Sequence, residues 1–335
     1  MERTVRNKKE LETVKNVKKG YKMDRNLGPA DAIFVADLHL TDTVPVSRKD
    51  DYFSSQKSKL RFLRRVQRSN NNCPVLCSGD VFDYWKASPL LCNMAYNFLP
   101  RPFYTIPGQH DLPMHSIEQF EKSALSLLSS VDDDITVLMY GNREISFNKF
   151  DVIGLPFGVD LDNFKPDIEH NRKRKILMIH QLIWPGAKPP WGTNNWNAEE
   201  LLKKFDGVFD IVLCGDNHGG FVVKGKNCTI VNPGSMLRAN ADQSNYKPAF
   251  YLYYTKTNEL IRIEYPIQDN VHEFSYIYGR KEKEERISAY IERMKTEFDI
   301  GMSFEKNIQE FFNENKTSEK VKKIIWSHWE QGGIK

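Results

Sequence analysis

The sequence has few features of a secreted or membrane protein. Its five cysteines form no Cys-x-x-Cys pair, which argues against a zinc knuckle or a disulfide framework and suits a reducing compartment. No apolar run approaches the roughly 18 residues of a membrane span, and the basic N-terminus has no apolar signal core. Low-complexity tracts and internal repeats are also missing. We therefore expect a cytoplasmic protein without membrane association.

Charge of one sign is not in large excess either. The net charge of +4 is small against 48 basic and 44 acidic residues, so the overall charge does not by itself indicate a nucleic-acid partner. A chain of 335 residues is long enough for one large domain with appendages. We expect a basic N-terminal extension (1–30), a catalytic domain (31–268) and a helical C-terminal extension (269–335).

The two extensions each allow two interpretations. The N-terminal one is either an arm that follows phosphates or a solvated helix before a linker at Leu27-Gly28-Pro29. The C-terminal one has apolar residues at helical spacing, among them Ile287 and Tyr290. Its helices either cap the catalytic domain or dock a partner.

Short apolar runs recur through the middle of the chain, each ending in polar residues. They cover residues 32–36, 74–77, 103–106, 151–155, 176–179 and 210–214. Such runs are typical of buried strands, and the helical patterns between several of them predict an α/β fold. Antiparallel hairpins after residue 220 are expected to complete a second sheet.

Side chains that can bind metal follow five of these predicted strands. Because strand ends gather functional groups in α/β proteins, the five clusters are expected to meet in one site. A lone member would be weak evidence, but the joint occurrence is specific. The clusters are Asp37 and His39; Asp80 and Asp83; Gln109, His110 and Asp111; His180; and Asp216 and His218.

In this order the clusters resemble the motifs of the calcineurin-like metallophosphoesterases. That family carries Asp-x-His, Gly-Asp-x-x-Asp, Gly-Asn-His-Asp or Glu, a lone His, and Gly-His-x-His. Within it, residues 79–83 and 232–235 look like SbcD-type nucleases and phage-encoded metallophosphoesterases, and residues 85–89 look like the phage group. Protein Ser/Thr phosphatases have Arg-Gly where Tyr84 and Trp85 stand and Glu where Asp111 stands, so that branch is disfavoured.

The resemblance implies a fold of two packed mixed β-sheets flanked by helices, and a two-metal phosphoesterase in which a metal-bridging hydroxide attacks phosphorus. By the family pattern, His110 is the acid that protonates the leaving oxygen. Asp83 and Asp111 orient an imidazole or a ligand. The first metal takes Asp37, His39, Asp80 and His218, and the second takes Asp80, Gln109, His180 and Asp216.

Two residues depart from the family pattern, and both belong to the second metal. Gln109 replaces the family Asn, and Asp216 replaces the first His of the last motif. A carboxylate in place of an imidazole makes the site richer in oxygen, which favours Mn²⁺, with Mg²⁺ or another transition metal as alternatives. We expect a Mn²⁺ enzyme with an alkaline optimum; a weakened second site is the competing interpretation.

Candidate substrate contacts are less specific. Arg61 and Arg65 share one face of a predicted helix, which either follows a phosphate backbone or is a solvated face. Trp191 lies in a loop where it either stacks on unpaired bases or packs locally. Arg48 and His115 are further candidates for phosphate contacts.

The leading interpretation is an SbcD-like DNA exonuclease or endonuclease. DNA is then the substrate, and an SMC-like ATPase of SbcC type and a second copy of the chain are candidate partners. One alternative is a phosphodiesterase or phosphatase that acts on small nucleotides. Another is a catalytically silent scaffold that binds protein.

Overall fold

The structure is a computed structural model that describes residues 27–139, 143–166, 171–187, 196–274 and 304–331. The chain divides into two compact units, Met1–Glu273 and Phe274–Lys335. Most of the predicted basic N-terminal extension, and the part of the C-terminal extension that holds Ile287 and Tyr290, lie outside the described residues.

The first sheet of the larger unit has the strand order β14-β13-β1-β2-β3-β4. Strands β1 to β4 are parallel, and β13 and β14 join antiparallel beside β1. The strands are β1 (Ala32–Val35), β2 (Val75–Cys77), β3 (Phe103–Thr105), β4 (Ile135–Val137), β13 (Ala249–Tyr254) and β14 (Glu259–Glu264).

The second sheet has the order β11-β12-β10-β7-β6-β5, with β6, β7, β10 and β12 parallel. Its strands are β5 (Glu144–Ser146), β6 (Phe150–Leu155), β7 (Arg174–His180), β10 (Ile211–Gly215), β11 (Phe221–Lys224) and β12 (Thr229–Asn232). A separate short pair joins β8 (Ile183–Trp184) to β9 (Trp196–Asn197).

The prediction for the late hairpins was wrong in one respect. Strands β11 and β12 belong to the second sheet, but β13 and β14 extend the first. Strand β13 is buried along its whole length, with Phe250 and Leu252 on one face and Tyr251 and Tyr253 on the other. A strand that is apolar on both faces needs a covered position, and the place beside β1 supplies one.

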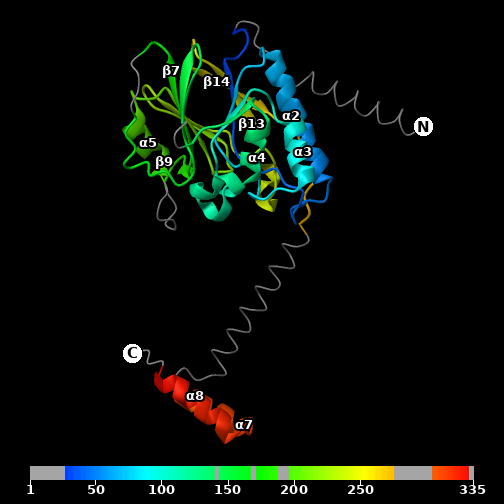
Figure 1. Ribbon diagram of the computed structural model, residues 1–335, viewed down its shortest axis with the longest axis vertical. Coiled ribbons are helices and arrows are strands. Elements are labelled where there is room, and N and C mark those ends of the chain that lie inside the picture. Colours follow the sequence, from blue (N-terminus) through cyan, green and yellow to red (C-terminus); the bar gives the residue numbers. More distant parts are fainter. Residues whose placement is uncertain (1–26, 140–142, 167–170, 188–195, 275–303, 332–335) are drawn as a thin grey trace, which may run out of the picture. The chain divides into compact units, whose positions relative to one another are not determined.

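Helices cover the outer face of each sheet, and Figure 1 shows α2 and α3 on one side and α5 on the other. Asp51 begins α2 by accepting the Ser54 backbone N–H, and Ser88 begins α3 by accepting that of Leu91. The helices are α2 (Tyr52–Ser69), α3 (Pro89–Phe98), α4 (Ala124–Val131) and α5 (Ala198–Phe205), with 3₁₀ turns η1 (Gln109–Asp111), η2 (Pro113–His115), η3 (Ile117–Lys122) and η4 (Ala241–Asn245).

Alternation along the strands divides the core into three layers. In β1, Ile33 and Val35 pack toward the helices, whereas Ala32 and Phe34 pack between the sheets. Strand β7 does the same, because Leu177 belongs to the cluster under α5 and its neighbours face the first sheet. This period of two is what a strand buried on both faces requires, and it confirms the predicted sandwich of two mixed sheets flanked by helices.

The C-terminal unit contains α7 (Phe304–Glu314) and α8 (Glu319–Gln331). The rings of Phe312 and Trp326 meet edge to face, with centroids 6.2 Å apart, so the two helices pack against each other. None of the helices in the described part of the chain is long and apolar enough to cross a membrane.

Candidate metal centre

The predicted metal-binding residues meet at the carboxyl ends of five parallel strands. Asp37 and His39 follow β1, Asp80 follows β2, and the segment 109–111 follows β3 in the first sheet. His180 is the last residue of β7 and Asp216 follows β10 in the second sheet. Because the carboxyl ends of neighbouring parallel strands lie at one edge of a sheet, each sheet contributes one half of the site.

Asp80 lies at the middle of this cluster. Its Oδ2 atom is 3.5 Å from Nε2 of His39 and 3.3 Å from Nε2 of His180. Nε2 of His39 is in turn 3.0 Å from Nε2 of His218. Asp37 completes two groups, one with His39 and His218 and one with Asp80 and His180. The ligand atoms within each group lie within 4.8 Å of one another.

The second ring nitrogen of two of these histidines is held from behind. Nδ1 of His180 donates to the backbone carbonyl of Ser78 at 2.6 Å, and Nδ1 of His39 lies 3.2 Å from Oδ1 of Asp83. Such contacts fix the tautomer and direct the other nitrogen forward, as is usual for histidine ligands. In both rings Nε2 therefore faces Asp80.

The backbone at the site adopts conformations that most residues avoid. The side chains at four site positions sit on left-handed backbone, with φ of 48° at Asp37, 42° at His39, 51° at Asp80 and 73° at Asp216. Such positions cost about 1–3 kcal/mol each and cluster at functional sites. Gly108 is also required by the site, because a Cβ atom at this position would overlap the Asp80 carboxylate.

The two residues that depart from the family pattern contact each other. Nε2 of Gln109 donates to Oδ1 of Asp216 at 2.6 Å. The backbone N–H of Asp216 donates to Oδ1 of Asp37 at 3.0 Å, which ties the pair to the rest of the cluster. The extra methylene of Gln109 and the carboxylate of Asp216 thus form one hydrogen-bonded unit.

His110 stands at the rim and is partly exposed. Its Nδ1 donates to the backbone carbonyl of Asp83 at 2.7 Å, and its ring meets the ring of His39 edge to face at 4.8 Å. The Asp111 carboxylate accepts the backbone N–H groups of Val81, Phe82 and Gly108. Asp83 therefore contacts both imidazoles, whereas Asp111 holds the loops after β2 and β3 together.

The donor set fits a divalent metal centre. Five side-chain atoms in the cluster are buried and have no hydrogen-bond partner among the described residues: Oδ2 of Asp37, Nδ1 of His39, Oδ2 of Asp80, Oε1 of Gln109 and Nε2 of His180. Buried polar atoms without a partner are rare and costly. Carboxylate, amide and imidazole donors converging on one place are what a divalent ion needs.

Metal binding should release protons and strengthen with rising pH. In the metal-free chain, burial lowers the pKa of His39, but Asp83, Asp80 and Asp37 outweigh it and raise that pKa to about 9. Burial also lowers the pKa of His180, but the carboxylates of Asp80 and Asp37 outweigh this effect and raise that pKa to about 10. Metal binds the neutral imidazole, so protons compete with it below these pKa values.

The measurement is calorimetric titration of the chelator-treated chain with Mn²⁺ in buffers of different ionisation enthalpy. We expect proton release at pH 7, and an affinity that increases between pH 7 and pH 9. Binding without proton release at pH 7 would contradict the assignment of these two imidazoles as ligands.

The substrate-contact candidates on the first half of the chain occupy different environments. Arg48 is only 8% exposed and donates two hydrogen bonds of 2.7 Å to the carboxylate of Asp50. Arg61 and Arg65 are exposed on α2, and the Arg61 guanidinium lies over the Phe98 ring, 4.8 Å from its centroid. Of these three, only the two α2 residues present their charge to solvent.

His115 is exposed near the centre, with its ring 5.9 Å from that of Phe157. The Phe157 ring is in turn 6.5 Å from that of His180, so an aromatic row leads from the rim to a metal-binding candidate. Trp191 lies outside the described residues. The motifs gave no signal for Phe157, nor for the Ser78 carbonyl that holds His180, because a backbone group leaves no trace in residue identity.

Comparison with known proteins gives a family and one distant relative. Residues 32–220 match the family described as calcineurin-like phosphoesterase. The DNA double-strand break repair protein Mre11 of Methanosarcina mazei is 25% identical over 256 residues, which is 72% of this chain and 38% of that protein. This chain therefore spans well under half the length of that relative.

Solved structures are similar at a lower level. A novel archaeal phosphodiesterase superposes with a TM-score of 0.38 and 12% identity, over 70% of this chain and 98% of its own. A protein of Thermus thermophilus superposes with a TM-score of 0.40 and 12% identity, over 69% and 96%. The family assignment rests on the sequence match.

The matched segment starts at β1 and ends just after His218, so it contains every candidate metal ligand. The family uses a dinuclear metal centre, and this chain has groups of His and Asp side chains that could hold a metal ion. Since the match covers more than half of the 335 residues, the chain belongs to the calcineurin-like phosphoesterase family and is related to Mre11.

Proposed function

We propose that the chain is a two-metal phosphodiester hydrolase and a DNA nuclease of SbcD or Mre11 type. The observation that carries this proposal is the Asp80 carboxylate, which lies 3.5 Å from Nε2 of His39 and 3.3 Å from Nε2 of His180 and accepts the His110 backbone N–H. A carboxylate between two sets of donors suits a shared ligand of two ions.

The proposed ligands of one ion are Asp37, His39, Asp80 and His218, and those of the other are Asp80, Gln109, His180 and Asp216. Two divalent ions held there would polarise the phosphate and would supply a water of lowered pKa as the nucleophile. The amide oxygen of Gln109 and the Asp216 carboxylate make the second set rich in oxygen, which supports Mn²⁺ or Mg²⁺ as the ion.

His110 is the proposed general acid. Because its Nδ1 donates to the Asp83 carbonyl, the proton that it can give away is on Nε2, the atom on the opposite side of the ring. The His110 side chain is partly exposed, as contact with a bound phosphodiester requires. The imidazolium would protonate the leaving oxygen and then recover its proton from solvent.

DNA is the proposed substrate because the Mre11 relative is a DNA double-strand break repair protein. The exposed Arg61 and Arg65 of α2 are candidates to follow the phosphate backbone, and His115 is a candidate at the rim. We propose residues 31–268 as the catalytic domain, and the helices after residue 269 as a docking element for an SbcC-type ATPase or a second copy.

The test is hydrolysis by the purified chain of labelled single- and double-stranded DNA and of bis-p-nitrophenyl phosphate, each with Mn²⁺ and with chelator. We expect DNA cleavage that depends on metal. Cleavage of the small diester alone would move the assignment to small nucleotides. Inactivity of the metal-loaded chain on every substrate would instead indicate a binding scaffold.

A further inference from the structure

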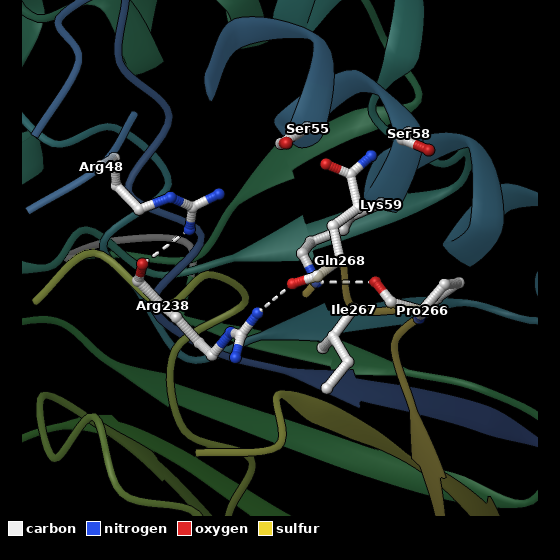
Figure 2. A pocket seen from close by; sticks show the side chains of 8 residues that line it. All are labelled: Arg48, Ser55, Ser58, Lys59, Arg238, Pro266, Ile267 and Gln268. Atoms are coloured by element: carbon white, nitrogen blue, oxygen red, sulfur yellow. Dashed lines mark hydrogen bonds between the residues drawn. The ribbon is translucent and has the colours of Figure 1, made fainter. Parts of the chain in front are cut away.

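A polar cavity lies in the larger unit and shares no residue with the candidate metal centre. It has a volume of about 120 Å³ and its lining side chains are drawn in Figure 2; they come from four separate segments. These are the loop before α2, α2 itself, and the two stretches that flank β13 and β14. The lining residues are Arg48, Ser55, Ser58, Lys59, Arg238, Pro266, Ile267 and Gln268.

Three of the lining side chains are cationic and almost completely buried. Arg48, Lys59 and Arg238 are 8%, 7% and 8% exposed. Dashed lines in Figure 2 join each of them to a backbone carbonyl: Arg48 to that of Arg238 at 2.7 Å, Arg238 to that of Gln268 at 2.6 Å, and Lys59 to that of Pro266 at 3.2 Å. Neutral carbonyls satisfy donors but do not balance charge.

Only one carboxylate balances this cluster by direct contact. Asp50 pairs with Arg48, but among the described residues neither Lys59 nor Arg238 has a carboxylate within 4.0 Å. Burial, together with Arg238 and Arg48, lowers the pKa of Lys59 to about 7. Asp269 and Asp50 act on Arg238 without direct contact. A buried cation without a counter-ion in contact is unfavourable, so an anion in the pocket would stabilise the Arg238 guanidinium and the charged form of Lys59.

The pocket is open to solvent at one end. Ser58, Pro266 and Gln268 are exposed, and Ile267 is 42% exposed. A ligand from solvent would therefore reach the three buried cations through a polar opening, and Ser58 of α2 lies at this mouth of the pocket.

We propose that this pocket binds a phosphate group, either as inorganic phosphate or as the terminal phosphate of a nucleotide or DNA strand. A phosphate anion supplies the negative charge that Lys59 and Arg238 lack in direct contact. Guanidinium groups bind tetrahedral oxyanions through directed hydrogen bonds, and an ammonium adds a compact point charge. The small volume admits a phosphate but leaves a nucleoside attached to it outside the mouth.

The first test is calorimetric titration of the full chain at pH 7 with inorganic phosphate, both metal-loaded and after chelation. Phosphate that binds only the metal centre would be lost on chelation, whereas the pocket should retain one phosphate per chain. Loss of all phosphate binding after chelation would overturn the proposal. The result does not depend on the proposed nuclease activity, because the chelated chain needs no turnover.

Two variants assign the binding to the pocket. Ser58→Asp puts a negative charge at the mouth and is expected to weaken phosphate binding at least about tenfold by repulsion. Ser54→Asp makes the same charge change at an exposed position of α2 outside the pocket, and should leave binding unchanged. Equal affinity of Ser58→Asp and the wild type would overturn the proposal even if Lys59→Gln, a further variant, failed to fold.

Two further ligands distinguish inorganic phosphate from the terminal phosphate of a nucleotide. The chelated chain is titrated with thymidine 5′-monophosphate and with thymidine. Binding of the monophosphate but not of thymidine would identify a terminal phosphate as a ligand. Binding of inorganic phosphate alone would restrict the site to the free ion. Equal binding of thymidine and its monophosphate would overturn recognition of the phosphate group.

Discussion

The His110→Ala variant is expected to cleave DNA about 10²–10⁴-fold more slowly than the wild type, which is the usual contribution of a positioned general acid. The physical reason is that the leaving oxygen of DNA is an alkoxide, which departs slowly unless it is protonated. Among the described residues, the His110 ring donates its hydrogen bond to the Asp83 carbonyl and lies edge to face with His39. The ring is not one of the proposed metal ligands, so its removal should not change the metal content.

The matched measurement uses a leaving group that needs no proton. Nitrophenolate is a stable anion, so the rate with bis-p-nitrophenyl phosphate should fall much less than the rate with DNA. Metal content by elemental analysis serves as the control. An equal loss on both substrates, with the metals retained, would show that His110 does not act as the acid.

The Asp80→Asn variant is expected to lose most of its bound metal and at least about a thousandfold in activity, since metal catalysis contributes several kcal/mol. The carboxylate lies within 3.5 Å of two imidazoles and also accepts the His110 backbone N–H at 2.9 Å. An amide of the same shape keeps the packing but removes the charge. The readouts are metal content, turnover and the melting temperature of the chelated protein.

Asp83→Asn is the matched control for this variant. Asp83 is also a carboxylate of the motif after β2, but it is half-exposed and contacts His39 from behind. Its replacement is expected to cost about 10–100-fold, as changes behind a metal ligand usually do. Equal metal loss in the two variants would contradict the central position that we give to Asp80.

The strands that carry the site could be predicted because each is a short apolar run that ends in polar residues. The runs before Asp37, Asp80 and Gln109 became β1, β2 and β3, and those before His180 and Asp216 became β7 and β10. What each run pairs with is a long-range property. Residues 249–264 therefore read as a hairpin, but their position beside β1 could not be deduced from local pattern.

The coupling between side chains was equally hidden. Gln109 and Asp216 each read as a departure from a motif, and only their hydrogen bond shows that they act as one unit. The cationic pocket was also not predicted, because Lys59 and Arg238 lie far apart in the sequence and each looks like an ordinary surface residue. Burial, which sequence composition does not reveal, is what makes them informative.

The position of the proposed metal ligands on both sheets has a consequence for folding. Asp37 and Asp80 follow strands of one sheet, whereas His180 and Asp216 belong to the other. Ions held by both sets would connect segments that are distant along the chain. They would restrict the unfolded chain only if they also stayed bound to it. In the folded state the ions would form a reversible cross-link between the two sheets, comparable to a disulfide that closes a long loop. Metal supply would then determine how strongly the two halves of the sandwich are held together.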